Sequence, residues 1–467
     1  MSVSIFDSFL TTSDMIAAFD DAAVVQAMFR FEASLARAQA AEGLVPQEAA
    51  SAIAGVCKAE LYDIPALILA GRRAGSLAIP LVKELTRTVA LYDEAAARHV
   101  HRGSTSQDVI DSALVLVTRD ALRLLDDGLH ALCGRLLRLA EGHLSTPVLA
   151  RTLMQPAQVT SFGFKAAGWL APLVRARARI REAAARALQL QLGGAVGTLS
   201  AMGERGTLVA ERMAQDLGLK LADSAWHTQR DEWVRLGMEV AVLAGSLGKL
   251  ATDLSLMAQG EVAELAEPSG GGRGGSSAMP HKRNPVSSMI ALAAARRTPQ
   301  HAAALLACMN QEHERGLGNW QAELAEWPNL FLSAHGALHA LDEAFAGLQV
   351  DGGRMRSNIE SLHGLVFAEA ASSYLAGAIG RPAAHALLED LSRQANGERG
   401  LEDLLRAAVR ADPALSAQVD LDGLARVFDP VAAAEPARRL AERQLQSLRA
   451  DMAAFEATHP FHEQITA

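Results

Sequence analysis

The sequence predicts an all-α protein, and three observations support that prediction. Aromatic residues make up only 4% of the 467 residues, although hydrophobic residues together reach 50%. Alanine and leucine are abundant, which favours helices over sheets because neither residue is β-branched or aromatic. Several apolar patterns with helical spacing are also far longer than an ordinary helix of about 11 residues. Helices of such length pack side by side, so we expect a bundle at the centre of the molecule.

These patterns divide the chain into three predicted helical domains. The N-terminal domain, 1–110, has short helices separated by polar breaks, at 22–42 and 46–59. The central domain, 111–350, contains the long-helix bundle, with helices predicted at 107–144, 162–192, 231–259 and 286–312. The C-terminal domain, 351–467, returns to shorter helices, at 354–363, 366–379, 383–396 and 436–459.

Composition restricts the partners of this chain. The net charge of −9 provides no basic surface for nucleic acid or for an acidic membrane. We expect no apolar run of the length of a membrane span, and hence no membrane partner. The three cysteines, Cys57, Cys133 and Cys308, are widely spaced and form no metal-type pair. Together with an N-terminus that lacks a basic start and an apolar signal core, they favour a cytoplasmic protein without a bound metal.

A glycine-rich loop at 269–285 carries the strongest chemical signal. Five of the six residues before Ser276 are glycine, and Pro285 suits the first turn of the helix that follows. Ser276, Lys282 and Asn284 bring a potential base, a fixed cation and an amide donor close together. A serine hydroxyl becomes a base when backbone N–H groups and a nearby cation stabilise its alkoxide. A flexible basic surface loop is the alternative interpretation.

The segment 275–285 resembles the signature loop of the fumarase/aspartase superfamily. It reads Gly-Ser-Ser-Ala-Met-Pro-His-Lys-Arg-Asn-Pro and matches G-S-S-x-M-P-x-K-x-N-P at each fixed position. The resemblance implies that Ser276 is the catalytic base and that Lys282 and Asn284 hold a substrate carboxylate. We add His281, in the same loop, to the substrate-binding candidates. The resemblance also implies an all-α fold with a central long-helix bundle, and no metal or organic cofactor.

Self-association is a second expectation. The segment 238–248, inside a predicted bundle helix, is apolar around most of its circumference. One bundle cannot bury such a helix on all sides, so another copy of the chain is the simplest cover. The superfamily resemblance implies a homotetramer in which three chains build each active site.

The segment 101–108, His-Arg-Gly-Ser-Thr-Ser-Gln-Asp, resembles a second superfamily element, H-x-G-x-T-S-x-D. Ser104, Thr105 and Ser106 would offer hydroxyl donors to substrate carboxylates just before a predicted helix, whose N-terminus also favours an anion. An ordinary helix cap is an alternative reading and is compatible with the first. His101 could orient a carboxylate or pass a proton, or it could be a packed or surface histidine.

The segment 151–158, Arg-Thr-Leu-Met-Gln-Pro-Ala-Gln, resembles a third element and departs from it. Most superfamily members read R-T-H-G-Q, and their histidine is the general acid for the leaving group, whereas this chain has Leu153. A carboxylate leaving group needs no acid, because the pKa of its conjugate acid is about 4. The departure therefore predicts opening of a lactone and, in reverse, cyclisation of an unsaturated acid. Thr152 and Gln155 would hold another carboxylate.

Further segments resemble the cycloisomerase branch of the superfamily, at 24–46, 162–170, 226–231 and 312–320. That branch implies a small anionic polycarboxylate substrate, lactonised reversibly during breakdown of aromatic acids. His227 and Arg315 are additional candidate anion contacts, with structural ion pairs or caps as the alternative.

Two other functions remain open. An adenylosuccinate lyase can have the same signature loop, but the stretch 317–328 lacks the serine and arginine that such lyases use for the nucleotide phosphate. A non-catalytic structural relative is the second alternative, and the presence of Ser276, Lys282 and Asn284 argues against it.

Overall fold

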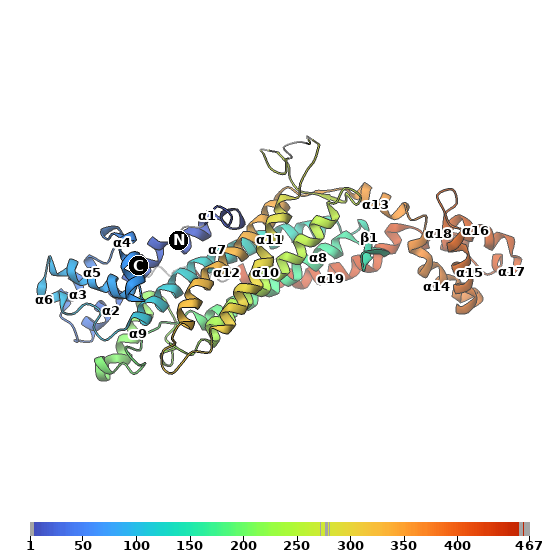
Figure 1. Ribbon diagram of the computed structural model, residues 1–467. Coiled ribbons are helices and arrows are strands. Elements are labelled where there is room, and N and C mark those ends of the chain that lie inside the picture. Colours follow the sequence, from blue (N-terminus) through green and yellow to red (C-terminus); the bar gives the residue numbers. More distant parts are fainter. Residues whose placement is uncertain (1–3, 271, 276–278, 280, 457–460, 462–467) are drawn as a thin grey trace.

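The computed structural model describes residues 4–270, 272–275, 279, 281–456 and 461. Figure 1 shows an elongated molecule with the N-terminal helices at one end, a bundle of long helices in the middle and the C-terminal helices at the other end. The all-α prediction is confirmed, since the two sheets found in the described residues have only two strands each.

The N-terminal part consists mainly of short helices. Its helices are α1 (Ser13–Ala18), α2 (Asp21–Ala41), α3 (Gln47–Gly55), α4 (Ile64–Ala74), α5 (Ala78–Ala90) and α6 (Glu94–Ala97), with 3-10 turns at Ser8–Leu10 and Ala59–Leu61. The longest of them, α2, begins where the side chain of Asp20 accepts a hydrogen bond from the backbone N–H of Ala23. α2 packs against the bundle through α7.

Five long helices form the bundle. They are α7 (Ser106–Gly142), α8 (Phe162–Ala187), α10 (Asp231–Met257), α11 (Val286–Ala307) and α12 (Asn319–Ala346). A shorter helix, α9 (Gly206–Leu217), follows a 3-10 turn at Ser200–Arg205. The first four bundle helices begin within about one residue of their predicted starts, but α8 and α11 end at Ala187 and Ala307, before their predicted ends at 192 and 312. α12 is not among the predicted helices, and it contains Pro328, a residue that normally interrupts a helix.

Two short sheets, absent from the sequence prediction, connect bundle elements. β1 (Pro147–Thr152) pairs antiparallel with β2 (Gln155–Ser161), and β3 (Leu265–Ala266) pairs with β4 (Gln349–Val350). The β1–β2 hairpin turns at Leu153 and Met154, whose φ angles are 51° and 67°. Such a two-residue turn normally carries Asn and Gly, so the sequence gives no signal for it.

The C-terminal part has a hydrophobic core of its own. Its helices are α13 (Gly352–Glu360), α14 (Ala368–Ile379), α15 (Arg381–Gln394), α16 (Leu401–Ala411), α17 (Pro413–Ser416), α18 (Leu421–Val427) and α19 (Pro430–Glu456), with a 3-10 turn at Leu365–Phe367. α19 runs back along the bundle and packs against α8 (Figure 1). The predicted end of that helix, 457–459, lies outside the described residues.

The main core extends from the N-terminal helices through the bundle without a break. At its centre Trp327 is fully buried, and its ring stacks on Trp233 with 3.9 Å between centroids. A second core lies mostly within 359–428. α7 begins at Ser106, before the predicted boundary at 110, and the three-domain division of the sequence stays a prediction.

One bundle helix, α10, is long and apolar enough to cross a membrane by length and composition, with a mean hydropathy of 1.3 over its most apolar window. The expectation that no apolar stretch reaches that length is therefore wrong. The same test is passed by core helices, and α10 packs against α8, α11 and α12. That packing buries 44% of the apolar window, and core helices share its composition, so α10 alone does not indicate a membrane partner.

Candidate active site

Arg315 and the hydroxyls of the second motif meet at one end of the bundle. The Arg315 guanidinium donates to Thr105 Oγ1 at 2.5 Å, to Ser106 Oγ at 3.2 Å and to Gln107 Oε1 at 3.3 Å. Arg315 comes from the loop between α11 and α12, whereas the hydroxyls stand at the start of α7. A cation beside a helix N-terminus attracts an anion, so this arrangement suits a carboxylate. Ser104, the residue before Thr105, is half-buried.

Asp108 holds this region together from inside the protein. The carboxylate is fully buried and accepts hydrogen bonds from the backbone N–H groups of Gly193 at 3.0 Å, Gly194 at 2.9 Å and Thr105 at 3.0 Å. Its Oδ1 also lies 2.8 Å from Nε2 of His227, which is only 3% exposed. The structure thus places His227 behind the hydroxyl cluster, paired with Asp108. Its contact with substrate stays a prediction.

A buried ionic network lies deeper at the same end. Arg230 is fully buried, donates to Asp111 at 2.9 Å and forms a second ion pair with Glu323. Trp320 Nε1 also donates to Asp111, at 2.9 Å. Burial acts to lower the pKa of Arg230, but the charges of Asp111 and Glu323 outweigh it and raise the pKa, so the guanidinium stays charged. The network ties α7 to α12 and was not found by sequence reasoning.

His101 also belongs to this end of the bundle. Its Nδ1 lies 2.6 Å from Oε1 of Glu32, a buried residue of α2. Burial acts to lower the pKa of His101, but the charge and hydrogen bond of Glu32 and the charge of Asp108 outweigh it and raise the pKa. Sequence reasoning singled out His101 and missed Glu32, which lies among the buried residues of α2.

The third motif lies at the far end of α7. α7 has 37 residues and therefore spans about 55 Å. Thr152 and Gln155 flank the turn of the β1–β2 hairpin that follows it, and both side chains are exposed. At the tip of that turn, Leu153 is 96% exposed and Met154 is 71% exposed. Within one chain these residues are too far from Ser104 to share a substrate of small size.

The signature loop is closed at its base. The backbone N–H of Asn284 donates to the carbonyl of Gly274 at 2.9 Å. Gly274 has a φ of 70°, and a Cβ there would lie 2.9 Å from the carbonyl oxygen of Asn284, so only glycine fits. Glu267 accepts from the N–H groups of Ser287 at 2.8 Å and Ser288 at 2.9 Å and so caps α11.

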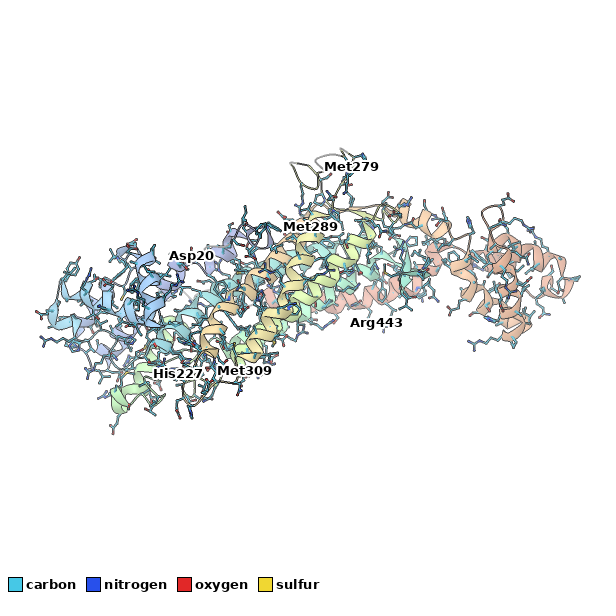
Figure 2. All side chains as sticks on the ribbon, viewed as in Figure 1. Asp20, His227, Met279, Met289, Met309 and Arg443 are labelled. Atoms are coloured by element: carbon cyan, nitrogen blue, oxygen red, sulfur yellow. The ribbon has the colours of Figure 1, made fainter. Side chains whose placement is uncertain are left out.

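The loop itself presents its candidate residues outward. His281 and Lys282 are exposed, and Asn284 is half-buried. A cavity of about 490 Å³ at the base of the loop is lined in part by Glu267, Asn284 and Asp351. Ser276 lies outside the described residues. Figure 2 shows two labelled residues, His227 behind the hydroxyls of 104–106 and Met279 in the signature loop. They lie far apart along the bundle.

Among the residues that the structure describes, no three His, Cys, Asp or Glu side chains form a group that could hold a metal ion. The expectation that the protein needs neither a metal nor an organic cofactor stays a prediction.

Comparison with known proteins identifies the family. A lyase family model matches residues 9–298. The chain belongs to the fumarase/aspartase superfamily of lyases. It is 47% identical over 442 residues to the 3-carboxy-cis,cis-muconate cycloisomerase of Bradyrhizobium diazoefficiens, covering 95% of this chain and 97% of that protein. It is 48% identical over 441 residues to the enzyme of the same name from Pseudomonas aeruginosa, covering 94% and 95%.

A solved structure agrees in fold. The crystal structure of 3-carboxy-cis,cis-muconate lactonizing enzyme from Pseudomonas putida matches with a TM-score of 0.90 and 42% identity, over 96% of this chain and 99% of that one. The fumarase/aspartase fold expected from the signature loop is thereby confirmed, and the protein is an enzyme of this superfamily. The roles of individual residues stay predictions.

Proposed function

We propose that this protein is a 3-carboxy-cis,cis-muconate cycloisomerase. It converts the unsaturated tricarboxylate reversibly into carboxymuconolactone during the breakdown of aromatic acids such as protocatechuate through β-ketoadipate. Leu153 is the observation that carries the proposal, because a side chain without a proton to give suits a carboxylate leaving group. The cycloisomerase names of the similar proteins support the same substrate. We place the enzyme in the cytoplasm, in solution.

We further propose a homotetramer with shared active sites. The hydroxyl cluster around Arg315 and the Leu153 hairpin stand at opposite ends of α7, about 55 Å apart. A substrate of three carboxylates needs groups from both ends, so different copies must supply them. The exposed apolar turn of the hairpin supports this arrangement, since contact with another copy would cover it.

In the cyclising direction, a carboxylate oxygen of the substrate adds to the activated double bond. The electron pair of that bond moves onto a neighbouring carboxylate as an aci-type anion. Lys282, Asn284 and the Ser104–Ser106 hydroxyls stabilise the new charge. Ser276 then gives a proton to the carbon, and in the reverse direction it removes that proton. Thr152, Gln155 and Arg315 hold the remaining carboxylates, and no cofactor takes part.

Adenylosuccinate lyase activity is the enzyme alternative. Its products include fumarate, and its nucleotide substrate carries a phosphate that needs cationic partners. In the sequence, Arg315 is followed by no arginine until Arg354, so 317–328 offers none for such a phosphate. This absence favours the cycloisomerase over the lyase.

The test is an ultraviolet assay of the purified protein with 3-carboxy-cis,cis-muconate, beside adenylosuccinate and without added metal. We expect loss of the diene absorbance with the first substrate and no fumarate from the second. The Ser276→Ala protein should keep its fold by circular dichroism and lose turnover. Fumarate release without loss of diene absorbance would overturn the proposal.

A further inference from the structure

A buried glutamate in α2 is not explained by packing. The side chain of Glu32 is 0% exposed, and its Oε1 lies 2.6 Å from Nδ1 of His101. Its other oxygen, Oε2, is buried and has no hydrogen-bond partner among the described residues. A buried carboxylate with an unused oxygen costs on the order of 1–3 kcal/mol. This unfavourable free energy points to a role for Glu32 in the function of the site.

The segment that carries His101 is fixed against the same helix. His101 itself has a φ of 58°, a left-handed conformation that costs a non-glycine residue about 1–2 kcal/mol. Gln39, two turns after Glu32 on the same face of α2, donates to the carbonyl of Arg102 at 2.6 Å. The Arg102 guanidinium in turn donates to the carbonyl of Leu44 at 2.6 Å. The backbone is therefore held in one position while the ring contacts Glu32.

This geometry gives the two nitrogens of the His101 imidazole different roles. Nδ1 contacts Glu32, so Nε2 is the nitrogen that remains for a substrate. The His101 side chain is 19% exposed, which leaves it accessible at the end of the bundle where Ser104–Ser106 stand. The pairing of a histidine with a carboxylate fixes the tautomer and orientation of the ring.

The charged groups around His101 favour its protonated form. Glu32 faces the ring from α2, and Asp108 acts on it from α7; both raise the pKa, whereas burial lowers it. The neighbouring Cys57 thiol stays neutral because burial and Glu32 raise its pKa. Arg102, next in sequence, directs its guanidinium to Leu44. The net effect is an imidazole that keeps its proton to a higher pH than an ordinary histidine.

We propose that Glu32 is a positioning residue for the cycloisomerase reaction, which holds His101 as an oriented cation that donates a hydrogen bond from Nε2 to a substrate carboxylate. The proposal rests on the proposed function. Glu32 does not touch the substrate and acts only through His101. The single negative charge on Glu32 compensates the cation, so the buried pair carries no net charge.

The test is the pH profile of kcat/KM for Glu32→Gln. Glutamine has the same shape and removes the charge. Because the pKa of His101 is raised in the folded protein, its cation is present at low pH and is lost as the pH rises through that value. In Glu32→Gln this loss should begin at lower pH. The ratio of wild-type to variant kcat/KM should thus grow as the pH rises, reaching about tenfold if the substitution lowers the pKa of His101 by 1.

Matched variants separate this role from a structural one. Glu42→Gln makes the same change at the end of α2, where Glu42 pairs with Arg205 and Arg212, and should leave the profile unchanged. In a His101→Gln background, Glu32→Gln should add no further pH dependence. A profile in Glu32→Gln that falls uniformly, with its alkaline limb at the wild-type pH, would overturn the proposal.

A second readout does not depend on turnover. Diethyl pyrocarbonate modifies neutral imidazole, so its rate at His101, followed by mass spectrometry, reports the pKa of that residue. The midpoint should lie at lower pH in Glu32→Gln than in the wild type. Equal midpoints would reject the role of Glu32 whatever the substrate is. A lower midpoint in the variant, together with a wild-type protein that fails to turn over the muconate, would reject the proposed function and keep the Glu32–His101 pair.

Discussion

The candidate residues at the two ends of the bundle differ in their hydrogen bonding and in their exposure. Where α7 begins, Thr105 and Ser106 are bonded to Arg315, and Asp108 is buried beneath them with backbone N–H groups and His227 around its carboxylate. Where α7 ends, the hairpin turn stands in the open, with Leu153 96% exposed. Lys282 in the signature loop is exposed as well.

The difference concerns which groups are already oriented before a substrate binds. Groups that stabilise charge work best when they are oriented before the substrate arrives, because no reorganisation is then needed during the reaction. The first end has this property within one chain. The second end gains its surroundings only through contact with another copy, if the proposed tetramer forms. The candidate residues where α7 begins are therefore oriented within one chain, whereas the turn where α7 ends is exposed.

The largest effect on stability should come from removing the charge of Arg230, at the end of the bundle where α7 begins. Arg230→Met leaves Asp111 and Glu323 as buried charges without their cation. We expect a loss of about 3–5 kcal/mol in the free energy of unfolding, measured by denaturant titration.

The matched control for that change is Arg186→Met. Arg186 is 48% exposed and pairs with the exposed Glu182 one helical turn away and, at 3.7 Å, with the half-buried Glu232. These surface pairs should contribute only about 0–1 kcal/mol. Equal losses in the two variants would show that the buried network does not stabilise the end of the bundle where α7 begins.

A second prediction tests whether the two ends meet between copies. Arg315→Ala damages one end and Lys282→Ala the other, so each protein alone should have little activity. When the two are unfolded together and refolded as mixed oligomers, about a quarter of the sites should combine two intact halves. Activity should return to roughly that fraction of the wild type.

The control mixes Arg315→Ala with Thr105→Ala, two changes at the same end. A site in that mixture always contains one damaged residue at the first end, so no recovery is expected. Recovery in neither mixture, with tetramers present by light scattering, would contradict a site shared between the two ends.

Much of the fold could be predicted from sequence because long helices leave long periodic patterns. The starts of α8, α10 and α11 at Phe162, Asp231 and Val286 agree with prediction. The β1–β2 hairpin could not be found, because Leu153 and Met154 adopt positive φ angles that their side chains do not favour. The pairing of β1 with β2 closes that turn, and no local propensity marks it.

The candidate site shows the same limit. Arg315 and the Ser104–Ser106 hydroxyls were each chosen from motifs, and the structure brings them together. Glu32 was missed because a glutamate within an amphipathic helix does not reveal what it faces. The partner of Glu32 is His101, 69 residues away in sequence, and only the packing of α2 on the bundle end brings them into contact. The role of Ser276 rests on the signature loop and stays a prediction.

The smallest expected effect concerns the turn at the open end. Replacing Leu153 by Asn and Met154 by Gly supplies residues that adopt positive φ angles readily. The free energy of unfolding should therefore rise by about 1–2 kcal/mol. If the two apolar side chains line a site in another copy, kcat/KM should fall by roughly tenfold or more even though the protein is more stable. His363→Asn is the control, since His363 also has a positive φ, of 50°, and lies in the C-terminal part. That variant should keep full activity. A double variant that is both more stable and fully active would show that the strained turn is a feature of the fold alone, whereas stability gained at the expense of turnover would mark it as part of the site.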